Sequence, residues 1–545
     1  MVYENIGVSV DTSWARNFLE SSRSVWMIGV VILCLFALTN LPWQLDDYDQ
    51  AQQAFTSFEM IKEGHWFFQR TPHAKVIAQK PPLVGWASAA TFAITRSWDI
   101  AWRLPSFLTG VVLATILFRA AIAAYGAAAA LIALGAFGLN LLSVRLATLV
   151  RTDMPLALVI FLLGLLIWQK IRAREPWHPR ERWEMFALLA ASMFIKGPIV
   201  FAFLLPGIVV FQWLAGKRSE ANAWCGWWPW IASLALFSVW VICGIKFVPG
   251  FYELVVMKEF LGRFSQTVHR PEPILFYLPH LLQKFAPWSV LILALGVLSF
   301  RRTRSGIRNL FRETTPDILW LVCWSLGGFV VMSLVPSKRV DRIYPVVPPL
   351  CLLLAAQIAG GFRIRQPDER VLQWSAAALL FSIVFTGGYT AAKVLSDYRD
   401  HANHLEVFSR AVNEQAVAHH WRYEAISGRG GGYEGMLLYL QKPRFLKPDE
   451  AVQEWNGGAL DALVVPKDRI SELMPELQNA AIAPLQSVDR KTDPQIGYLL
   501  VTRGSCLTRN LLIDSIALRS QRRFPTLSNK VMSSHDASAP LKAGE

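Results

Sequence analysis

The residues of this chain that could do chemistry are carboxylates, lysines and arginines placed at the borders of long apolar segments. Three aspartates, Asp46, Asp47 and Asp49, begin one charged stretch, and Lys80 closes it. Carboxylates can accept a proton from a hydroxyl or hold a metal ion, while lysine and arginine can stabilise anionic oxygen atoms. Further side chains of these kinds follow at Asp153, Lys196, Glu259, Arg263, His269, Arg270 and Lys338. Together they predict a polar site assembled from distant segments.

Composition determines what surrounds such a site. Apolar residues make up 53% of the 545 residues and charged residues only 17%, where a soluble protein carries about 25% charge. Apolar runs of roughly 18–20 residues recur, and each is long enough to cross a bilayer. The sequence therefore predicts an all-α polytopic membrane protein. The net charge of +14 then reflects basic cytoplasmic loops rather than nucleic-acid binding.

The basic clusters set the orientation. About eleven membrane spans are expected, together with juxtamembrane helices. One of these is Leu83–Thr95, which we predict does not cross the membrane. With that count the clusters at 170–182 and 301–312 lie in the cytoplasm, as the positive-inside rule requires. The outer loops are then residues 43–103 and 248–285, and all the candidate site residues fall on this non-cytoplasmic side.

Each candidate also has a purely structural interpretation. Asp49 could be the N-cap of a short amphipathic helix over residues 51–61, with Gly64 as its stop. Asp153 could cap the helix that follows it, and the three lysines could anchor helices at the membrane interface. If these lysines were only anchors, similar residues would be expected at the cytoplasmic face as well. Anchoring also does not explain why carboxylates stand at the starts of helices. The set as a whole therefore favours a functional site.

The composition changes near residue 395, which ends the predicted transmembrane domain 1–395. Short β-like runs alternate with helical patterns over residues 396–505, and the helical patterns include residues 435–440 and 470–480. This alternation predicts a small α/β domain on the extracytoplasmic side. Residues 506–545 lack periodicity and are predicted to be a disordered tail. The cysteines and histidines are too scattered to predict a metal cluster from local sequence.

The order of several short motifs resembles the GT-C superfamily of polytopic glycosyltransferases, in particular bacterial aminoarabinose–lipid A transferases and protein O-mannosyltransferases. The resemblance covers roughly residues 25–360. Its motifs are Asp49-Gln50-Ala51, Glu59-Met60-Ile61-Lys62-Glu63-Gly64-His65-Trp66, Lys80-Pro81-Pro82, Arg151-Thr152-Asp153-Met154, Lys196-Gly197-Pro198, Lys258-Glu259-Phe260-Leu261-Gly262-Arg263-Phe264, His269-Arg270 and Tyr277-Leu278-Pro279. No single motif is specific, but the ordered set is.

The resemblance implies a polyprenyl-phosphate sugar as donor and a hydroxyl on lipid A, another glycolipid, a polysaccharide or a protein as acceptor. It implies a bacterial inner membrane protein whose active site faces the periplasm. Asp49 would be the catalytic base, and Asp153 would orient the acceptor or a metal. The donor phosphate ligands would be Lys80, Arg263, Arg270 and Lys338, with supporting roles for Asp46, Asp47, Lys196, Glu259, His269 and Tyr277. No cofactor is required, although Asp49 and Asp153 could together hold a divalent metal.

Two departures from the family pattern leave alternatives open. The family's Asp-Glu pair is Asp49-Gln50 here, and Gln53 replaces a usual tyrosine, so Asp46 and Asp47 are rival candidates for the base. The segment Ser337-Lys338-Arg339 lacks the Leu-Pro that often follows the lysine.

The rival function is a polytopic transporter or lipid flippase of envelope precursors. It predicts repeats in the two halves of the chain, which the sequence lacks.

Overall fold

The computed structural model describes residues 13–40, 45, 48–70, 80–216, 222–262, 272–303, 314–360, 369–399, 404–428, 434–483 and 497–504. The chain divides into two compact units. Unit 1 comprises Met1–Asn413, Gly430–Phe445 and Ser487–Ile496, and unit 2 comprises Glu414–Arg429, Leu446–Gln486 and Gly497–Glu545. The predicted domain boundary at residue 395 lies inside a long helix, and the predicted tail lies outside the described residues.

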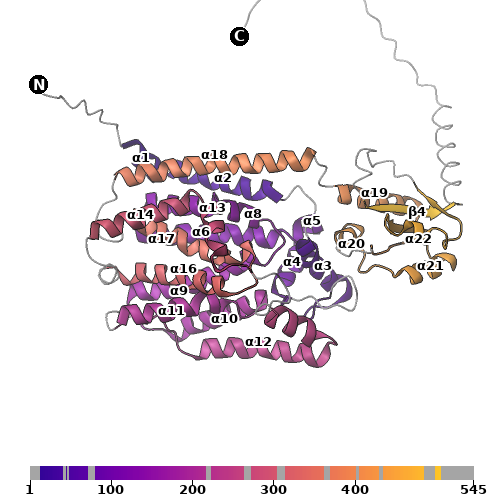
Figure 1. The fold of residues 1–545 in the computed structure, drawn as a ribbon, viewed down its shortest axis with the longest axis horizontal. Helices are drawn as coiled ribbons and strands as arrows, with labels where there is room; N and C mark the ends of the chain where they lie inside the picture. The colour runs from indigo at the N-terminus through magenta and orange to yellow at the C-terminus, as the bar shows by residue number, and fades with distance from the viewer. Residues whose placement is uncertain are drawn as a thin grey trace, which may run out of the picture. The chain divides into compact units, whose positions relative to one another are not determined.

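Unit 1 is a bundle of helices (Figure 1). Its helices are α1 (Ser13–Glu20), α2 (Ser22–Asn40), α3 (Tyr48–Glu63), α4 (Leu83–Thr95), α5 (Trp98–Ala101), α6 (Leu104–Tyr125), α7 (Ala127–Gly138), α8 (Leu141–Leu146), α9 (Asp153–Ala173), α10 (Pro179–Lys196), α11 (Val200–Ala215), α12 (Trp228–Phe247), η2 (Tyr252–Leu261), η3 (Ile274–Phe276), α13 (Tyr277–Lys284), α14 (Trp288–Thr303), α16 (Pro316–Leu334), η4 (Val340–Val346), α17 (Val347–Ile358), α18 (Glu369–Arg399) and α20 (Glu434–Leu440). Helix α19 (His404–His419) runs across the border between the units.

Six helical segments among the described residues are long and apolar enough to cross a membrane. They are Ser22–Asn40, Trp98–Tyr125, Asp153–Ala173, Trp228–Phe247, Pro316–Leu334 and Glu369–Tyr398, and a bent pair over residues 274–299 would make seven. The predicted count of about eleven is higher because several predicted spans are shorter helices, such as α7 and α11. One apolar run breaks into α7 and α8 where Asn140 caps α8 by accepting a hydrogen bond from the Ser143 amide.

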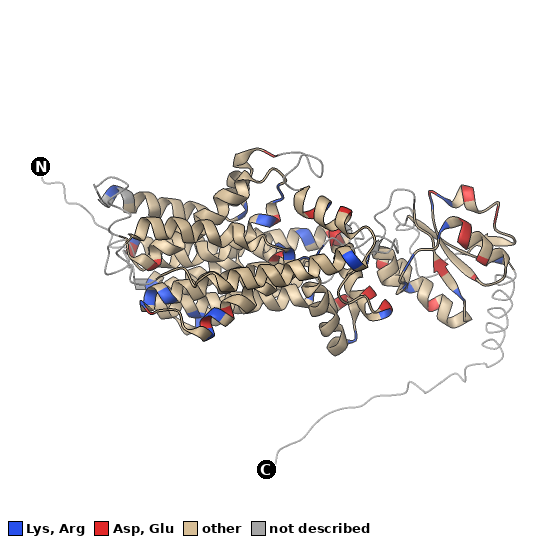
Figure 2. Ribbon diagram, turned by 90° about the horizontal axis from the view of Figure 1, so that it is seen from below, with Lys and Arg blue, Asp and Glu red and all other residues tan. Residues whose placement is uncertain are grey.

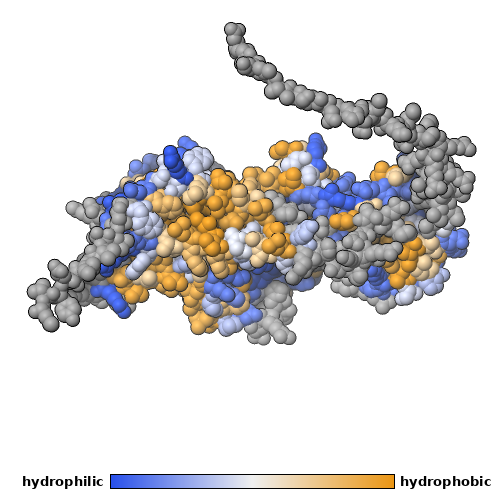
Figure 3. All heavy atoms as spheres, turned by 90° about the horizontal axis from the view of Figure 1, so that it is seen from above, coloured by the Kyte–Doolittle hydropathy of each residue, from blue (hydrophilic) through white to orange (hydrophobic). Residues whose placement is uncertain are grey.

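The surface of unit 1 fits a lipid environment. Hydrophobic residues occupy much of the face seen in Figure 3. Large apolar side chains on the candidate spans are exposed, including Trp26, Ile242 and Val384. Charged residues are more frequent toward the two ends of the bundle than along the helices between them (Figure 2). Exposed apolar surface of this extent would be unfavourable in water. We conclude that the chain is a multi-pass membrane protein.

Glycines allow the central helices to pack closely. A Cβ at Gly207 of α11 would lie 2.9 Å from the Trp324 Cα of α16, and one at Gly164 of α9 would lie 2.2 Å from the Trp324 ring. With a larger residue at either position, α11 or α9 could not approach α16 so closely. Small residues commonly allow such close packing between membrane helices. These contacts fix α9, whose first residue is the predicted site residue Asp153.

Unit 2 is built on a four-stranded mixed sheet, which confirms the predicted α/β character. The strands β1 (Tyr423–Ala425), β2 (Ala462–Pro466), β3 (Ala480–Ile482) and β4 (Tyr498–Arg503) lie in the order β1-β2-β4-β3. β1 is parallel to β2, while β4 is antiparallel to β2 and β3. The helices α21 (Pro448–Asn456) and α22 (Ile470–Leu473) accompany the sheet, and Trp455, Leu463 and Val501 belong to its core.

Two details differ from the sequence prediction. The helix predicted over residues 470–480 ends at Leu473, and Ala480–Ile482 forms β3 because it pairs with β4. The helical segment at α20 was predicted within the C-terminal domain, but α20 clusters with unit 1. There the hydroxyl of Tyr439 accepts a hydrogen bond of 2.9 Å from the Leu45 amide. This contact ties α20 to the segment that leads into α3.

Candidate active site

Helix α3 carries the central carboxylate. Its apolar residues Ala54, Phe55 and Phe58 are buried, and it ends before Gly64, whose φ of +77° favours glycine. The predicted amphipathic helix and its stop are therefore confirmed. Asp49 is the second residue of α3 and lies within the first turn rather than at the N-cap.

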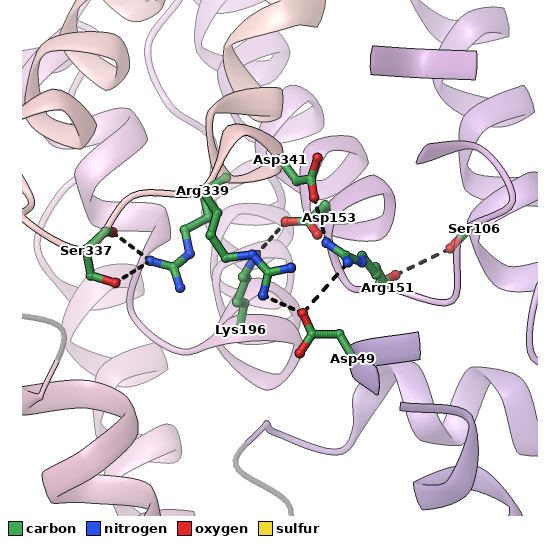
Figure 4. A network of polar contacts seen from close by, with 9 residues as sticks. Asp49, Ser106, Arg151, Asp153, Lys196, Ser337, Arg339 and Asp341 are labelled. Atoms are coloured by element: carbon green, nitrogen blue, oxygen red, sulfur yellow. Dashed lines mark hydrogen bonds and ion pairs between the residues drawn. The ribbon is translucent and has the colours of Figure 1, made fainter. Parts of the chain in front are cut away.

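Asp49 lies between two arginines (Figure 4). The Arg339 guanidinium donates to its Oδ2 atom, and the Nη2 atom of Arg151 lies 3.7 Å from the same oxygen. Arg151 also donates from Nη1 to Oδ2 of Asp341 at 2.6 Å. Both members of this second pair are almost fully buried. Arg151 therefore connects two carboxylates from distant segments, and its position depends on both.

The loop that carries Arg151 is fixed by hydrogen bonds to its main chain. Ser106 of α6 donates from Oγ to the Leu149 carbonyl at 2.7 Å. Gln50 of α3 accepts from the Val150 amide at 3.3 Å. The amide side chain that departs from the family's Asp-Glu pair thus joins α3 to the loop of Arg151.

A second ion pair lies beside the first network (Figure 4). Lys196 Nζ is 2.5 Å from Oδ1 of Asp153, and both side chains are largely buried. Asp153 begins α9 and Lys196 ends α10, so each charge lies at the helix end that favours it. The structure thus brings together Asp49, Asp153 and Lys196 among the residues predicted from the sequence.

Lys80 completes the group of charges around Asp49. It is partly exposed and immediately precedes Pro81-Pro82 and α4. Within the described part of the chain it makes no hydrogen bond or ion pair, but Asp49 and Asp153 are close enough to affect it. Burial lowers the pKa of Lys80 to about 8, although both carboxylates act in the opposite direction. An anionic ligand beside Lys80 would stabilise the charged form of this ammonium and raise its pKa.

The cations around Asp49 determine its protonation state. Burial raises the pKa of the Asp49 carboxyl, but the charges of Lys80, Arg339 and Arg151 outweigh this effect and hold the pKa below its usual value. Asp49 is therefore ionised at neutral pH. It can accept a hydrogen bond from a hydroxyl and take up its proton.

A small cavity lies near the Asp153–Lys196 pair. It has a volume of about 200 Å³, and its lining includes Lys196, Glu259, Ser337 and Arg342. Arg342 is buried and donates from Nη1 to the carbonyl and hydroxyl oxygens of Ser337 at 2.7 and 3.1 Å. Among the described residues it makes no ion pair. Burial lowers its pKa, and the cavity therefore offers a cation to an anionic or polar group.

The other predicted residues are placed less favourably or lie outside the description. Lys338 is buried, but its ammonium donates to the Glu272 carbonyl at 2.9 Å and does not join the contacts of Asp49. Tyr277 is fully buried at the start of α13. The residues outside the described part of the chain are Asp46, Asp47, Arg263, His269 and Arg270.

Four residues of this site were not predicted from the sequence, namely Arg151, Arg339, Asp341 and Arg342. The sequence does hold a signal for Arg339, Asp341 and Arg342, because they cluster with Lys338 directly after an apolar segment.

For metal binding, no group of three or more His, Cys, Asp and Glu side chains occurs in the described ranges. A metal held by Asp49 and Asp153 stays a prediction.

Comparison with known proteins gives the family context. A family profile described as dolichyl-phosphate-mannose-protein mannosyltransferase matches residues 79–243. The undecaprenyl phosphate-alpha-4-amino-4-deoxy-L-arabinose arabinosyl transferase of Pectobacterium atrosepticum is 27% identical over 378 residues, covering 66% of this chain and 63% of that protein. The enzyme of the same description from Pectobacterium carotovorum is 26% identical, covering 64% and 62%. The chain thus spans less than two thirds of the length of these curated relatives.

Solved structures extend the similarity over most of the chain. ArnT from Cupriavidus metallidurans bound to undecaprenyl phosphate superposes with a TM-score of 0.61 at 18% identity, covering 90% of this chain and 98% of that one. The archaeal oligosaccharyltransferase AglB from Archaeoglobus fulgidus, in complex with an inhibitory peptide and a dolichol-phosphate, gives 0.50 at 10% identity, covering 84% and 70%. The chain therefore has the GT-C-like fold of ArnT, and its predicted resemblance to the aminoarabinose transferases is confirmed.

Proposed function

We propose that this protein is a glycosyltransferase that moves a sugar from a polyprenyl-phosphate donor to a hydroxyl acceptor. The observation that carries the proposal is the ionised carboxylate of Asp49, placed among Lys80, Arg151 and Arg339 in a bundle of membrane-length helices. A carboxylate and several cations are what this transfer needs. Relatives of the chain are named as undecaprenyl-phosphate aminoarabinose transferases, and ArnT was solved with undecaprenyl phosphate.

The reaction would proceed by attack of the acceptor oxygen on the anomeric carbon of the sugar. The bond from this carbon to the phosphate oxygen breaks, and polyprenyl phosphate leaves with the bonding electrons. Asp49 takes the proton of the acceptor hydroxyl. Because its pKa is low, it is a weak base toward an unreacted alcohol, and transfer becomes favourable only as the attacking oxygen acquires positive charge. Asp49 would therefore act in the transition state.

The cations would divide into two groups. Arg151 and Arg339 already contact Asp49, and they set its charge and orientation. Lys80 makes no ion pair within the described residues, which makes it the best-placed ligand for the leaving phosphate. Arg342 could bind a further polar group in the 200 Å³ cavity. Arg263, Arg270 and Lys338 remain phosphate-ligand candidates from the sequence, and Asp153, held by Lys196, would orient the acceptor or a metal.

We further propose that the protein lies in a bacterial inner membrane with this site on the periplasmic side. The acceptor would be lipid A, another glycolipid, a polysaccharide or a protein, and unit 2 would be an extracytoplasmic domain. The basic cluster at residues 170–182 supports this orientation, because Asp153 and Arg172 lie near opposite ends of the apolar helix α9.

The test of the proposed activity uses purified protein and an undecaprenyl-phosphate sugar labelled in the sugar. Transfer of label to a membrane-lipid acceptor, with release of undecaprenyl phosphate in equal amount, is the expected result. A flippase would instead move the labelled lipid across a vesicle bilayer and leave the sugar–phosphate bond intact. Bond cleavage thus separates the two functions, and flipping without cleavage would contradict the transferase.

Cysteine labelling should establish the topology. In intact cells, a membrane-impermeant maleimide should label Asp468→Cys, in unit 2, more strongly than the parent protein. It should label Arg180→Cys no more strongly than the parent protein, although the Arg180 side chain is 89% exposed, because this residue belongs to the basic cluster predicted to be cytoplasmic. Both variants should react after the cells are lysed. The reverse pattern in intact cells would overturn the orientation.

A further inference from the structure

A basic groove lies at the end of the bundle remote from Asp49. Its volume is about 630 Å³, and it is lined by residues of α6 and α9 that include Ile116, Arg119, Leu165, Trp168 and Arg172. The groove combines two guanidinium groups with apolar walls. It shares no residue with the contacts of Asp49 or with the 200 Å³ cavity.

The distance from the candidate active site follows from helix geometry. Asp153 and Arg172 are 19 residues apart on α9, which corresponds to about 28 Å at 1.5 Å per residue. The hydrocarbon core of a bilayer is about 30 Å thick. If Asp153 lies near one membrane surface, Arg172 therefore lies near the other. The groove is then at the depth of the lipid head groups of the opposite leaflet.

The two arginines are available to a ligand. Among the described residues neither Arg119 nor Arg172 makes an ion pair, and the Arg172 guanidinium lies 4.8 Å from the centre of the Trp168 ring. Two nearby carboxylates serve another cation, because Lys170 pairs with Glu181 at 2.5 Å and with Glu175 at 3.4 Å. A third, Asp317, interacts with the hydroxyl of Tyr125. No ion pair among the described residues therefore neutralises the two guanidinium groups of the groove.

We propose that this groove binds the phosphate head group of an anionic phospholipid in the leaflet opposite the Asp49 site. Two guanidinium groups match the oxygen atoms of a phosphate diester, with which arginine forms paired hydrogen bonds. The walls formed by Ile116 and Leu165 would contact the upper part of an acyl chain. Basic pockets between membrane helices are suited to such lipids, and this inference does not depend on the proposed transferase activity.

Lipid binding to the full-length protein tests the proposal. The protein in neutral detergent is titrated with phosphatidylglycerol, and bound lipid is measured by native mass spectrometry. The double variant Arg119→Gln/Arg172→Gln should bind at least about 10-fold more weakly than the parent, because two charge-assisted contacts are lost. The matched control is Arg23→Gln/Arg301→Gln, which removes two exposed arginines outside the groove. It should bind within about twofold of the parent.

Three results would overturn the proposal. Equal weakening in both double variants would indicate general attraction by basic residues, and full binding by Arg119→Gln/Arg172→Gln would remove the groove as the site. Displacement of the lipid by an equal concentration of inorganic phosphate would indicate a small-anion site instead. Phosphatidylcholine, whose phosphate charge is balanced by its own ammonium group, should bind the parent more weakly than phosphatidylglycerol does.

Discussion

Replacing Asp49 by asparagine should lower sugar transfer by about 10²–10⁴-fold, the range expected when a general base is removed. The asparagine amide oxygen can still accept a hydrogen bond from Arg339, and asparagine is tolerated near a helix start. The variant should therefore fold, insert and bind donor much as the parent does. What it loses is the ability to take a proton. Turnover of labelled donor at saturation measures this loss, while thermal unfolding in detergent checks the fold.

Three controls separate the chemical role of Asp49 from its neighbours. Asp341→Asn alters the other carboxylate that contacts Arg151, so it tests whether disturbing Arg151 alone stops the reaction. It should reduce turnover far less than Asp49→Asn. Asp46→Asn and Asp47→Asn test the rival bases. Full activity in Asp49→Asn with loss in one of these two would move the base to that aspartate. Full activity in Asp49→Asn, Asp46→Asn and Asp47→Asn would exclude this segment as the source of the base.

The parts of this site that depend on local sequence could be predicted. Helix α3 and its glycine stop follow from apolar periodicity and a conformation that favours glycine. Helix α4 has the predicted bounds Leu83–Thr95, because two prolines precede an apolar run. Orientation by basic clusters also placed Asp49, Asp153 and Lys196 on one side before their contacts were known. Local rules and charge placement therefore suffice for these two helices and for grouping the three residues, while the membrane side that they face stays a prediction.

The pairing of charges could not be predicted in the same way. Arg339 contacts Asp49 across 290 residues of sequence, and no local pattern specifies such a partner. The neighbouring Lys338 points instead to the Glu272 carbonyl. Between two adjacent cations, only the backbone direction after α16 decides which one reaches the carboxylate. The sequence prediction named Lys338 as a phosphate ligand and gave Arg339 no role, whereas the structure places Arg339 beside Asp49.

Replacing Lys80 by alanine should reduce kcat/KM for the donor while leaving the amount of folded protein unchanged. A lost charge-assisted phosphate contact costs about 1.5–3 kcal/mol, or roughly 10- to 150-fold. Lys80 makes no ion pair within the described residues, so its removal leaves no described carboxylate without its partner. Donor kinetics at several donor concentrations give the effect. Unchanged KM and kcat would mean that Lys80 only anchors the loop at the membrane surface.

The pH profile makes this prediction specific to Lys80. Its pKa of about 8 means that the ammonium is charged below pH 8 and becomes neutral as the pH rises through that value. Because the donor phosphodiester keeps its charge over this range, kcat/KM should fall above pH 8 in the parent protein. Lys80→Arg keeps a positive charge and should remove the fall. Burial also lowers the pKa of Lys338, so Lys338→Arg is the matched control. A fall abolished by Lys338→Arg and retained in Lys80→Arg would assign the phosphate contact to Lys338.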